Sequence, residues 1–193
     1  LAVMNEHYLI NGCLQRDPLA QRELYNRFSP KMLGICYRFA QNKEDAEDML
    51  QEGFIKVFNK IEGFQNKGSF EGWIRKIMVH TCINFLKRNK RFQLTQDISE
   101  ANEVPAREES IASILQSKQV LECIRLLPLG YRTVLNLYAI EGYSHKEVGD
   151  LLEIGESTSR SQFTRAKNML AALLIKHKIV EEPSANVKWA FAK

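Results

Sequence analysis

Apolar residues recur at intervals of three and four positions along most of the chain, which predicts helices rather than strands. In the first half, Asn42 is a predicted N-cap with an acid three residues on, and its helix should end near Gly63. The apolar stripe of this helix comprises Ala46, Met49, Leu50, Phe54, Val57, Phe58 and Ile61. A second helix should begin near Ser69 and run into the basic segment 87–91. Its buried side comprises Trp73, Ile74, Ile77, Thr81, Cys82 and Phe85.

The pattern between 144 and 174 predicts two further helices joined by a tight turn. Ser144 and Glu147 have the spacing of a capping box, which marks the start of the first one. The turn falls at 154–156, where Gly155 is expected to adopt an unusual backbone conformation. The two buried sides comprise Val148, Leu151 and Leu152, and then Phe163, Ala166, Leu170, Leu173 and Leu174. This arrangement is typical of a helix-turn-helix, whose second helix enters the DNA major groove by its N-terminal end.

The outward side of that second helix is polar, and the segment 157–168 contains three basic residues and no acid. The outward positions are Ser157, Ser161, Thr164, Arg165 and Asn168, and they are flanked by Thr158, Arg160, Gln162 and Lys167. Arginine can read guanine edges, glutamine can read adenine, and short hydroxyl side chains let a helix approach phosphates. The face therefore favours duplex DNA as a ligand. An αα-hairpin with a solvated polar face is the alternative.

Helical periodicity stops between Phe92 and about Ser110, where acids replace large apolar residues in the manner of a linker. We therefore predict an all-α protein with two small helical domains joined by a flexible acidic linker. The predicted ranges are 1–91 for the first domain, 92–112 for the linker, 113–178 for the second domain and 179–193 for an unassigned tail. These domains carry net charges of +5 and +3 around a linker of −4, so both favour a polyanionic partner.

An acidic cluster marks the start of the helix that follows Asn42. It comprises Glu44, Asp45, Glu47, Asp48 and Glu52. Early acids favour the helix dipole, which explains the first members of the cluster better than it explains Glu52. An acidic patch for a basic partner is the other interpretation. Asp48 and Glu52 are expected one turn apart on the exposed side, where they repel each other.

The helix that begins near Ser69 combines an aromatic residue with cations. Its basic residues are Arg75, Lys76, Lys87, Arg88, Lys90 and Arg91. Aromatic side chains beside cations suit unstacked bases and phosphates. Trp73 also lies on the apolar stripe, so core packing is its alternative role, and His80 is more typical of a structural histidine than of a ligand.

Other function classes receive little support from the sequence. Cys13, Cys36, Cys82 and Cys123 form no C-x-x-C pair, so we expect buried thiols, a reducing cytoplasm and no metal site. We find no phosphate loop and no nucleophile–base pair, and therefore expect no enzyme, no cofactor and no small-molecule substrate. The longest apolar run, 169–175, is far short of the roughly 20 residues of a membrane span. The start of the chain has no secretory signal pattern.

Three segments together resemble bacterial RNA polymerase sigma factors of the extracytoplasmic-function (ECF) group. They are DAEDMLQEGFIKVFNKI at 45–61, FEGWIRKIMVHTCINFLKRNKR at 70–91 and LLPLGYRTVLNLYAIEGYSHKEVGDLLEIGESTSRSQFTRAKNML at 126–170. They occur in the family's order, and the resemblance covers about residues 5–176. It implies a promoter-specificity subunit that directs core RNA polymerase to specific promoters and assists strand opening, with no catalytic residues of its own.

The resemblance also implies partners for individual residues. Docking on the β′ clamp helices of core polymerase would involve Asp45, Asp48, Gln51 and Glu52. Minus-ten promoter DNA would be bound and melted by Phe64, Lys67, Ser69, Trp73, Arg75, Lys76, His80, Lys87 and Arg88. The minus-thirty-five element would be read by Ser157, Thr158, Arg160, Ser161, Gln162, Arg165 and Lys167. The polymerase β flap and an anti-sigma factor are further implied partners, and the linker would run towards the polymerase active site.

The chain departs from the family pattern at a few positions. His80 stands where the family often has Asn, and Asn84 where it often has Asp. Gly155 and Ser157 replace the usual Ser and Gly, so weaker capping of the second helix of the helix-turn-helix is expected.

Two other functions stay open: a stand-alone helix-turn-helix regulator that binds a duplex operator as a dimer, and a helical adaptor that binds only protein.

Overall fold

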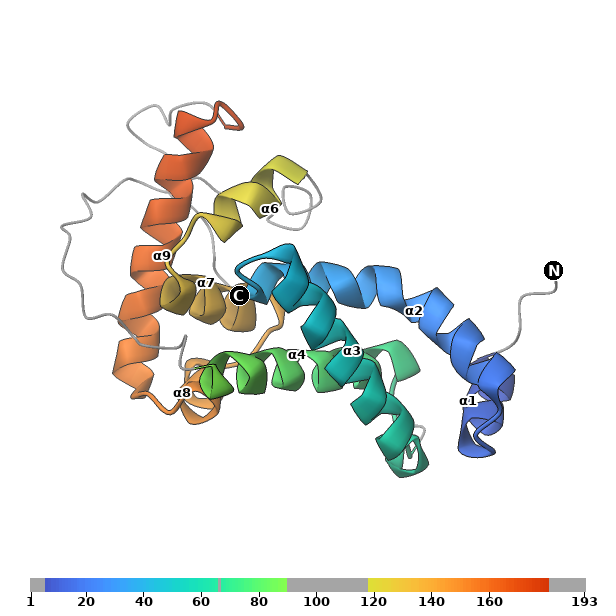
Figure 1. Ribbon diagram of the computed structural model, residues 1–193. Coiled ribbons are helices and arrows are strands. Elements are labelled where there is room, and N and C mark those ends of the chain that lie inside the picture. Colours follow the sequence, from blue (N-terminus) through green and yellow to red (C-terminus); the bar gives the residue numbers. More distant parts are fainter. Residues whose placement is uncertain (1–5, 66, 90–117, 181–193) are drawn as a thin grey trace. The chain divides into compact units, whose positions relative to one another are not determined.

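The computed structural model describes residues 6–65, 67–89 and 118–180 (Figure 1). Every regular element in these ranges is helical, and contacts divide the chain into two units, Leu1–Asn89 and Lys90–Lys193. The prediction of an all-α chain with two helical domains is confirmed. The predicted linker 92–112 and most of the tail 179–193 lie outside the described ranges, so the predicted boundaries stay a prediction. Within those ranges, no helix is both long and apolar enough to cross a membrane.

The first unit is a small helical bundle. Its elements are α1 (Glu6–Leu14), α2 (Pro18–Phe39), α3 (Lys43–Lys60), η1 (Ile61–Gly63) and α4 (Phe70–Arg88). In Figure 1, α3 (teal) and α4 (green) lie together, and both also pack on α2, while α1 packs on α2. Its fully buried side chains include Leu24, Met32, Phe39, Met49, Ile74 and Met78.

Both predicted helix starts in the first unit are confirmed by their caps. The Asn42 side chain accepts a hydrogen bond from the Asp45 backbone N–H at 2.7 Å, which satisfies a donor at the start of α3. The Ser69 hydroxyl accepts from the Gly72 N–H at 3.1 Å at the start of α4. The segment after α3 closes in the short 3₁₀ turn η1, which ends at Gly63 as expected.

The second unit is built around one long helix. Its elements are α6 (Lys118–Arg125), α7 (Leu129–Leu135), the π-helical turn η2 (Asn136–Ile140), α8 (His145–Leu152) and α9 (Glu156–Lys176). Helices α6, α7 and α8 all pack on α9, drawn in orange to red in Figure 1. Arg132 is buried in this unit and donates to the Arg125 carbonyl at 3.1 Å. Burial, and then the nearby Arg125 charge, lower the pKa of Arg132 to about 10.

The helix-turn-helix is confirmed as α8 and α9, and its capping box is present. The Ser144 hydroxyl accepts from the Glu147 N–H at 3.2 Å, and the Glu147 carboxylate accepts from the Ser144 N–H at 2.8 Å. The prediction for Gly155 is wrong, because this residue is an ordinary extended N-cap with φ −64°. The left-handed residue is Glu153, with φ 59° and ψ 41°, because α8 ends there.

The glycine that the turn requires lies instead in α8. A Cβ on Gly149 would approach the Ile154 carbonyl oxygen to 2.8 Å, which is a contact with rigid backbone. The Ile154 N–H donates to the Gly149 carbonyl at 3.0 Å, so the turn folds directly over this residue. Gly155 makes no side-chain capping bond, in agreement with the weaker capping expected for α9.

Candidate nucleic-acid interface

Helix α9 presents most of the predicted polar face to solvent. Ser157, Thr158, Arg160, Ser161, Thr164 and Arg165 are exposed, and Lys167 and Asn168 are half-buried. Gln162 is the exception, because only 8% of it is exposed. It was expected to flank the outward side, but it lies one turn before the fully buried Ala166 and is itself buried.

The exposed polar residues of α9 differ in how strongly the helix itself holds them. Ser161 and Thr164 donate to the carbonyls of Thr158 and Arg160 at 3.0 and 3.1 Å, which folds both hydroxyls against the helix. Arg160 forms an ion pair with Glu156 one turn earlier. Arg165 has no ion-pair or hydrogen-bond partner among residues 118–180. The guanidinium of Arg165 is therefore the one more available to an external acceptor.

A cluster of rings joins η2 and α8 to α9, with His145 and Phe163 buried and Tyr138 half-buried. The His145 ring stacks on Tyr138 with centroids 4.0 Å apart, and Phe163 packs against both rings at 5.7 and 4.6 Å. His145 Nδ1 lies 3.0 Å from the Ser159 hydroxyl, which is fully buried. Sequence reasoning missed this cluster, although Ser159 precedes Phe163 by one helical turn.

The electrostatics of His145 follow from that environment. Burial, and then the Arg160 charge, lower the pKa of the imidazole from its ordinary value of 6.5, while Glu156 acts weakly in the opposite direction. A neutral imidazole can share one hydrogen bond with the Ser159 hydroxyl and still stack on Tyr138. The ring is therefore a structural part of the helix-turn-helix.

In the first unit, aromatic rings gather where η1 leads into α4. Trp73 stacks on Phe70 with centroids 5.6 Å apart, and Phe64 packs against both rings at 5.5 and 4.9 Å. Phe70 is buried and contacts Phe28 at 5.8 Å, whereas Phe64 and Trp73 are half-buried. Trp73 is thus partly buried and partly exposed. Its buried part packs in the core, and its exposed part stays available for the predicted contact with DNA bases.

The other residues predicted for minus-ten DNA lie on or near α4. Lys67, Ser69, Lys76 and Arg88 are exposed, while Arg75, His80 and Lys87 are half-buried. Burial, and then Lys76 and Lys60, lower the pKa of His80, so the ring favours its neutral form beside these cations. The cluster of rings and cations is compatible with single-stranded nucleic acid, and the role of each residue stays a prediction.

The acidic cluster of α3 is not one continuous exposed patch. Asp48 and Gln51 are exposed, but Asp45 is only 7% exposed, and its docking role stays a prediction. Asp45 is the third residue of α3, and its backbone N–H donates to the Asn42 side chain. Glu52 is half-buried and forms an ion pair with Arg88 of α4. The sequence predicted that the Asp48 and Glu52 carboxylates repel each other, but it could not show that Arg88 of α4 neutralises Glu52.

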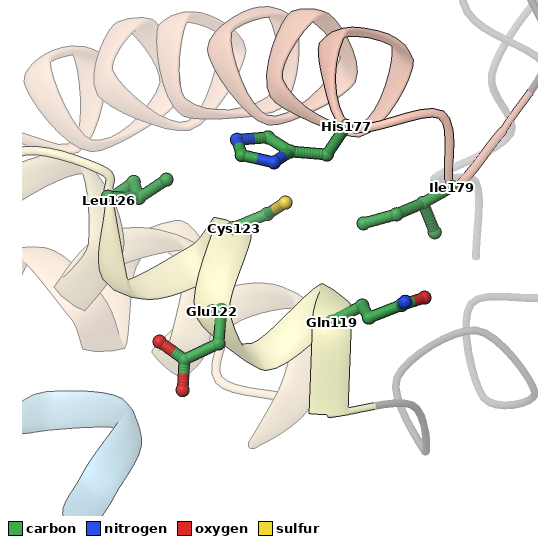
Figure 2. Close-up of a pocket in the computed structure, with 6 residues that line it drawn as sticks. All are labelled: Gln119, Glu122, Cys123, Leu126, His177 and Ile179. Atoms are coloured by element: carbon green, nitrogen blue, oxygen red, sulfur yellow. The ribbon is translucent and has the colours of Figure 1, made fainter.

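The pocket drawn in Figure 2 has a volume of about 180 Å³ and lies between α6 and the end of α9. Its lining comprises Gln119, Glu122, Cys123, Leu126, His177 and Ile179, and none of these is a predicted site residue. Burial, and then Glu122, raise the pKa of the Cys123 thiol, which opposes a nucleophilic thiolate. All four cysteines are free and buried, and within the described ranges no three potential metal ligands of the His, Cys, Asp and Glu types lie together.

Comparison with known proteins identifies the family. The family models for Sigma-70 region 2 and Sigma-70, region 4 match residues 24–92 and 117–170. The chain is 30% identical over 159 residues to the ECF RNA polymerase sigma factor SigE of Mycolicibacterium smegmatis, covering 80% of this chain and 62% of that relative. It is 26% identical to the ECF RNA polymerase sigma-E factor of Haemophilus influenzae, covering 86% of this chain and 94% of that one.

Among solved structures, the sigma factor RpoE in complex with the anti-sigma factor NepR from Bartonella quintana aligns at 20% identity with a TM-score of 0.48. That alignment covers 79% of this chain and 95% of the other. The two family models fall one on each unit, in the order in which the sequence motifs occur. The chain therefore belongs to the ECF group of sigma-70 family RNA polymerase sigma factors.

Proposed function

We propose that this chain directs bacterial core RNA polymerase to a specific set of promoters and assists opening of the DNA strands there. The observation that carries the proposal is the helix-turn-helix, whose second helix has no acidic residue from 157 to 168. Both sigma-70 family models match the same chain. The chain supplies recognition, and the polymerase supplies the chemistry of RNA synthesis. Its place of action would be the cytoplasm, where core polymerase works.

Duplex recognition is the role that we propose for the start of α9. Arg165 and Lys167 would reach base edges or phosphates of the minus-thirty-five element, and Ser157 and Thr158 would allow close approach to the backbone. Arg160 would have to exchange Glu156 for a DNA acceptor, which lowers its net contribution. Gln162 is left out of this set because it is buried.

Strand capture is the role that we propose for the ring cluster of the first unit. Phe64 and Trp73 are half-exposed aromatic surfaces on which an unstacked minus-ten base could lie. The neighbouring cations Lys67 and Lys76 are exposed and would pair with the phosphates of the same strand. The adjoining duplex is expected to open when the captured bases gain this stacking surface.

Polymerase docking is the role that we propose for the exposed side of α3. Asp48 and Gln51 are its available polar groups, and Asp48 has no ion-pair partner among the residues that the structure describes. A basic surface on the β′ clamp helices would complement them. The β flap and an anti-sigma factor are further proposed partners, and both rest on membership of the family.

The test is to mix the purified chain with bacterial core RNA polymerase and run the mixture on a sizing column. Transcription is then measured from a pool of promoter fragments. Co-elution together with new, specific start sites is the expected result. Failure to co-elute, combined with tight binding of the chain alone to a duplex operator, would contradict the proposal and support a stand-alone regulator.

A further inference from the structure

Glu52 lies at the centre of a charge network that joins α3 to α4. Its Oε1 accepts from Arg88 Nη2 at 2.5 Å, and its Oε2 lies 3.8 Å from Lys56 Nζ. The two residues of the closer pair are 36 positions apart in sequence, so the contact depends on the packing of α3 against α4. One carboxylate therefore shares its charge between two cations.

The network is anchored on both helices. Lys56 Nζ also donates to the Thr81 hydroxyl at 3.3 Å, and that hydroxyl donates to the Ile77 carbonyl at 2.8 Å, so Lys56 is held against α4. The Arg88 guanidinium lies 5.4 Å from the centre of the buried Phe85 ring. Arg88 thus has a defined position, given by the carboxylate on one side and the ring on the other.

Exposure leaves both groups of the pair within reach of partners. The side chains of Arg88 and Glu52 are 56% and 31% exposed. Because water and other charged molecules can compete for each charge, the pair is weak, and either member can exchange its partner for another charged group. By contrast, Glu47 on the same helix pairs, among the residues that the structure describes, only with Lys43 one turn earlier, at 3.5 Å.

From this geometry we infer that Glu52 is a positioning residue for Arg88, which it withholds from nucleic-acid phosphate while the chain is free. A basic surface that binds Glu52 would release the Arg88 guanidinium to a phosphate of the opened strand. The inference rests on the proposed function and extends it, because it adds Glu52 to the polymerase-docking groups of α3 and Arg88 to the strand-capture groups of α4. It replaces the simpler view in which Glu52 and Arg88 serve two partners independently.

The test measures binding of the free full-length chain to a fluorescent single-stranded oligonucleotide at several salt concentrations. Glu52→Gln should tighten binding about two- to fivefold, the range expected for losing a surface ion-pair competitor. The logarithm of affinity should also fall more steeply with the logarithm of salt, by about 0.7, because one more phosphate is contacted. A purely structural role for Glu52 would not steepen this slope.

Glu47→Gln is the matched control, because it removes one acid from α3 without freeing Arg88. It should change the affinity much less than Glu52→Gln does. Placing Glu52→Gln in an Arg88→Gln background should abolish its effect. Equal tightening by both acid variants, or an undiminished Glu52→Gln effect without Arg88, would overturn the inference.

The same chains are then assembled with core polymerase, and capture of the minus-ten strand is measured in the complex. The advantage of Glu52→Gln should shrink there, because docking already occupies Glu52 in the unmodified chain. A full advantage retained in the complex would overturn the release step. A chain that binds no polymerase would contradict the proposed function, while the oligonucleotide experiment would still decide whether Glu52 withholds Arg88.

Discussion

The two units of this protein hold their charged side chains in different ways. In the first unit, one acid of α3, Glu52, pairs with a cation of α4, Arg88, across the helix–helix contact. In the second unit, the exposed cation Arg160 at the start of α9 pairs along its own helix with Glu156, while the buried Ser159 contacts His145 of α8. In the second unit, α8 and α9 are joined by the half-buried ring of Tyr138 and the buried rings of His145 and Phe163.

This difference matters for recognition. Where charges pair across helices, a binding partner must compete with an internal contact, so binding at one helix affects the other. Where the cations stand on one rigid helix, a partner meets them without changing the packing beneath. The first arrangement suits a surface that responds to docking, and the second suits a preformed reading surface.

The largest expected effect comes from removing the ring that joins α8 and α9. Phe163→Ala should lower the free energy of unfolding of the second unit by about 3–5 kcal/mol, as is usual for a large-to-small change in a core. Hydrogen exchange would locate the loss in α8 and α9 and leave α2, α3 and α4 unchanged. A loss below about 1 kcal/mol would mean that the ring cluster contributes little to the packing of α8 on α9.

Next in size is the contribution of the exposed cations of α9. Arg165→Ala should weaken promoter use by about 1–3 kcal/mol, the range for a residue that reads a base. Arg160→Ala should cost less, because Arg160 must first leave Glu156. Transcription from a mapped promoter measures both variants, and the idea fails if Arg165→Ala leaves it unchanged.

A smaller effect is expected from the pair that crosses from α3 to α4. A double-mutant cycle of Glu52→Gln and Arg88→Gln should give a coupling of about 0.2–1 kcal/mol in the free energy of unfolding, typical of exposed pairs. The coupling should decrease as salt is added. Zero coupling at low salt would show that the Glu52–Arg88 pair does not hold α3 to α4, which would remove the contrast drawn between the two units.

The smallest expected effect is a pH dependence of the second unit. Burial keeps the pKa of His145 in the folded chain below its ordinary value of 6.5, so the unfolded chain binds the proton more readily. The stability that the neutral ring provides is therefore fully present above pH 6.5 and is lost as the pH falls below it. NMR titration of the imidazole, with His145→Gln as the control for stability, measures this. A pKa above 6.5 would reverse the sign and contradict the account.

Several elements of the fold could be predicted from sequence because local chemistry determines them. Asn42, Ser69 and Ser144 are capping residues whose side chains act within three positions, and each begins the helix expected of it. The apolar stripes likewise identified the buried faces of α3 and α9. The helix-turn-helix followed from these signals alone.

The errors arose where a second element determines the environment. Helical spacing places Glu52 on the outer side of α3, but only the packed fold brings Arg88 beside it. Gln162 was expected to flank the outward face of α9, yet only 8% of it is exposed in the packed unit. The tight turn was assigned to Gly155, whereas the close backbone approach falls at Gly149.

The most direct test of the account compares Asp48→Lys and Arg165→Ala for binding to core polymerase and for use of a mapped promoter. Asp48→Lys should prevent assembly with core polymerase and leave folding intact, because Asp48 is exposed. Arg165→Ala should assemble normally and lose promoter selection. If both variants fail in the same step, or if Asp48→Lys assembles normally, the assignment of separate partners to α3 and α9 is wrong.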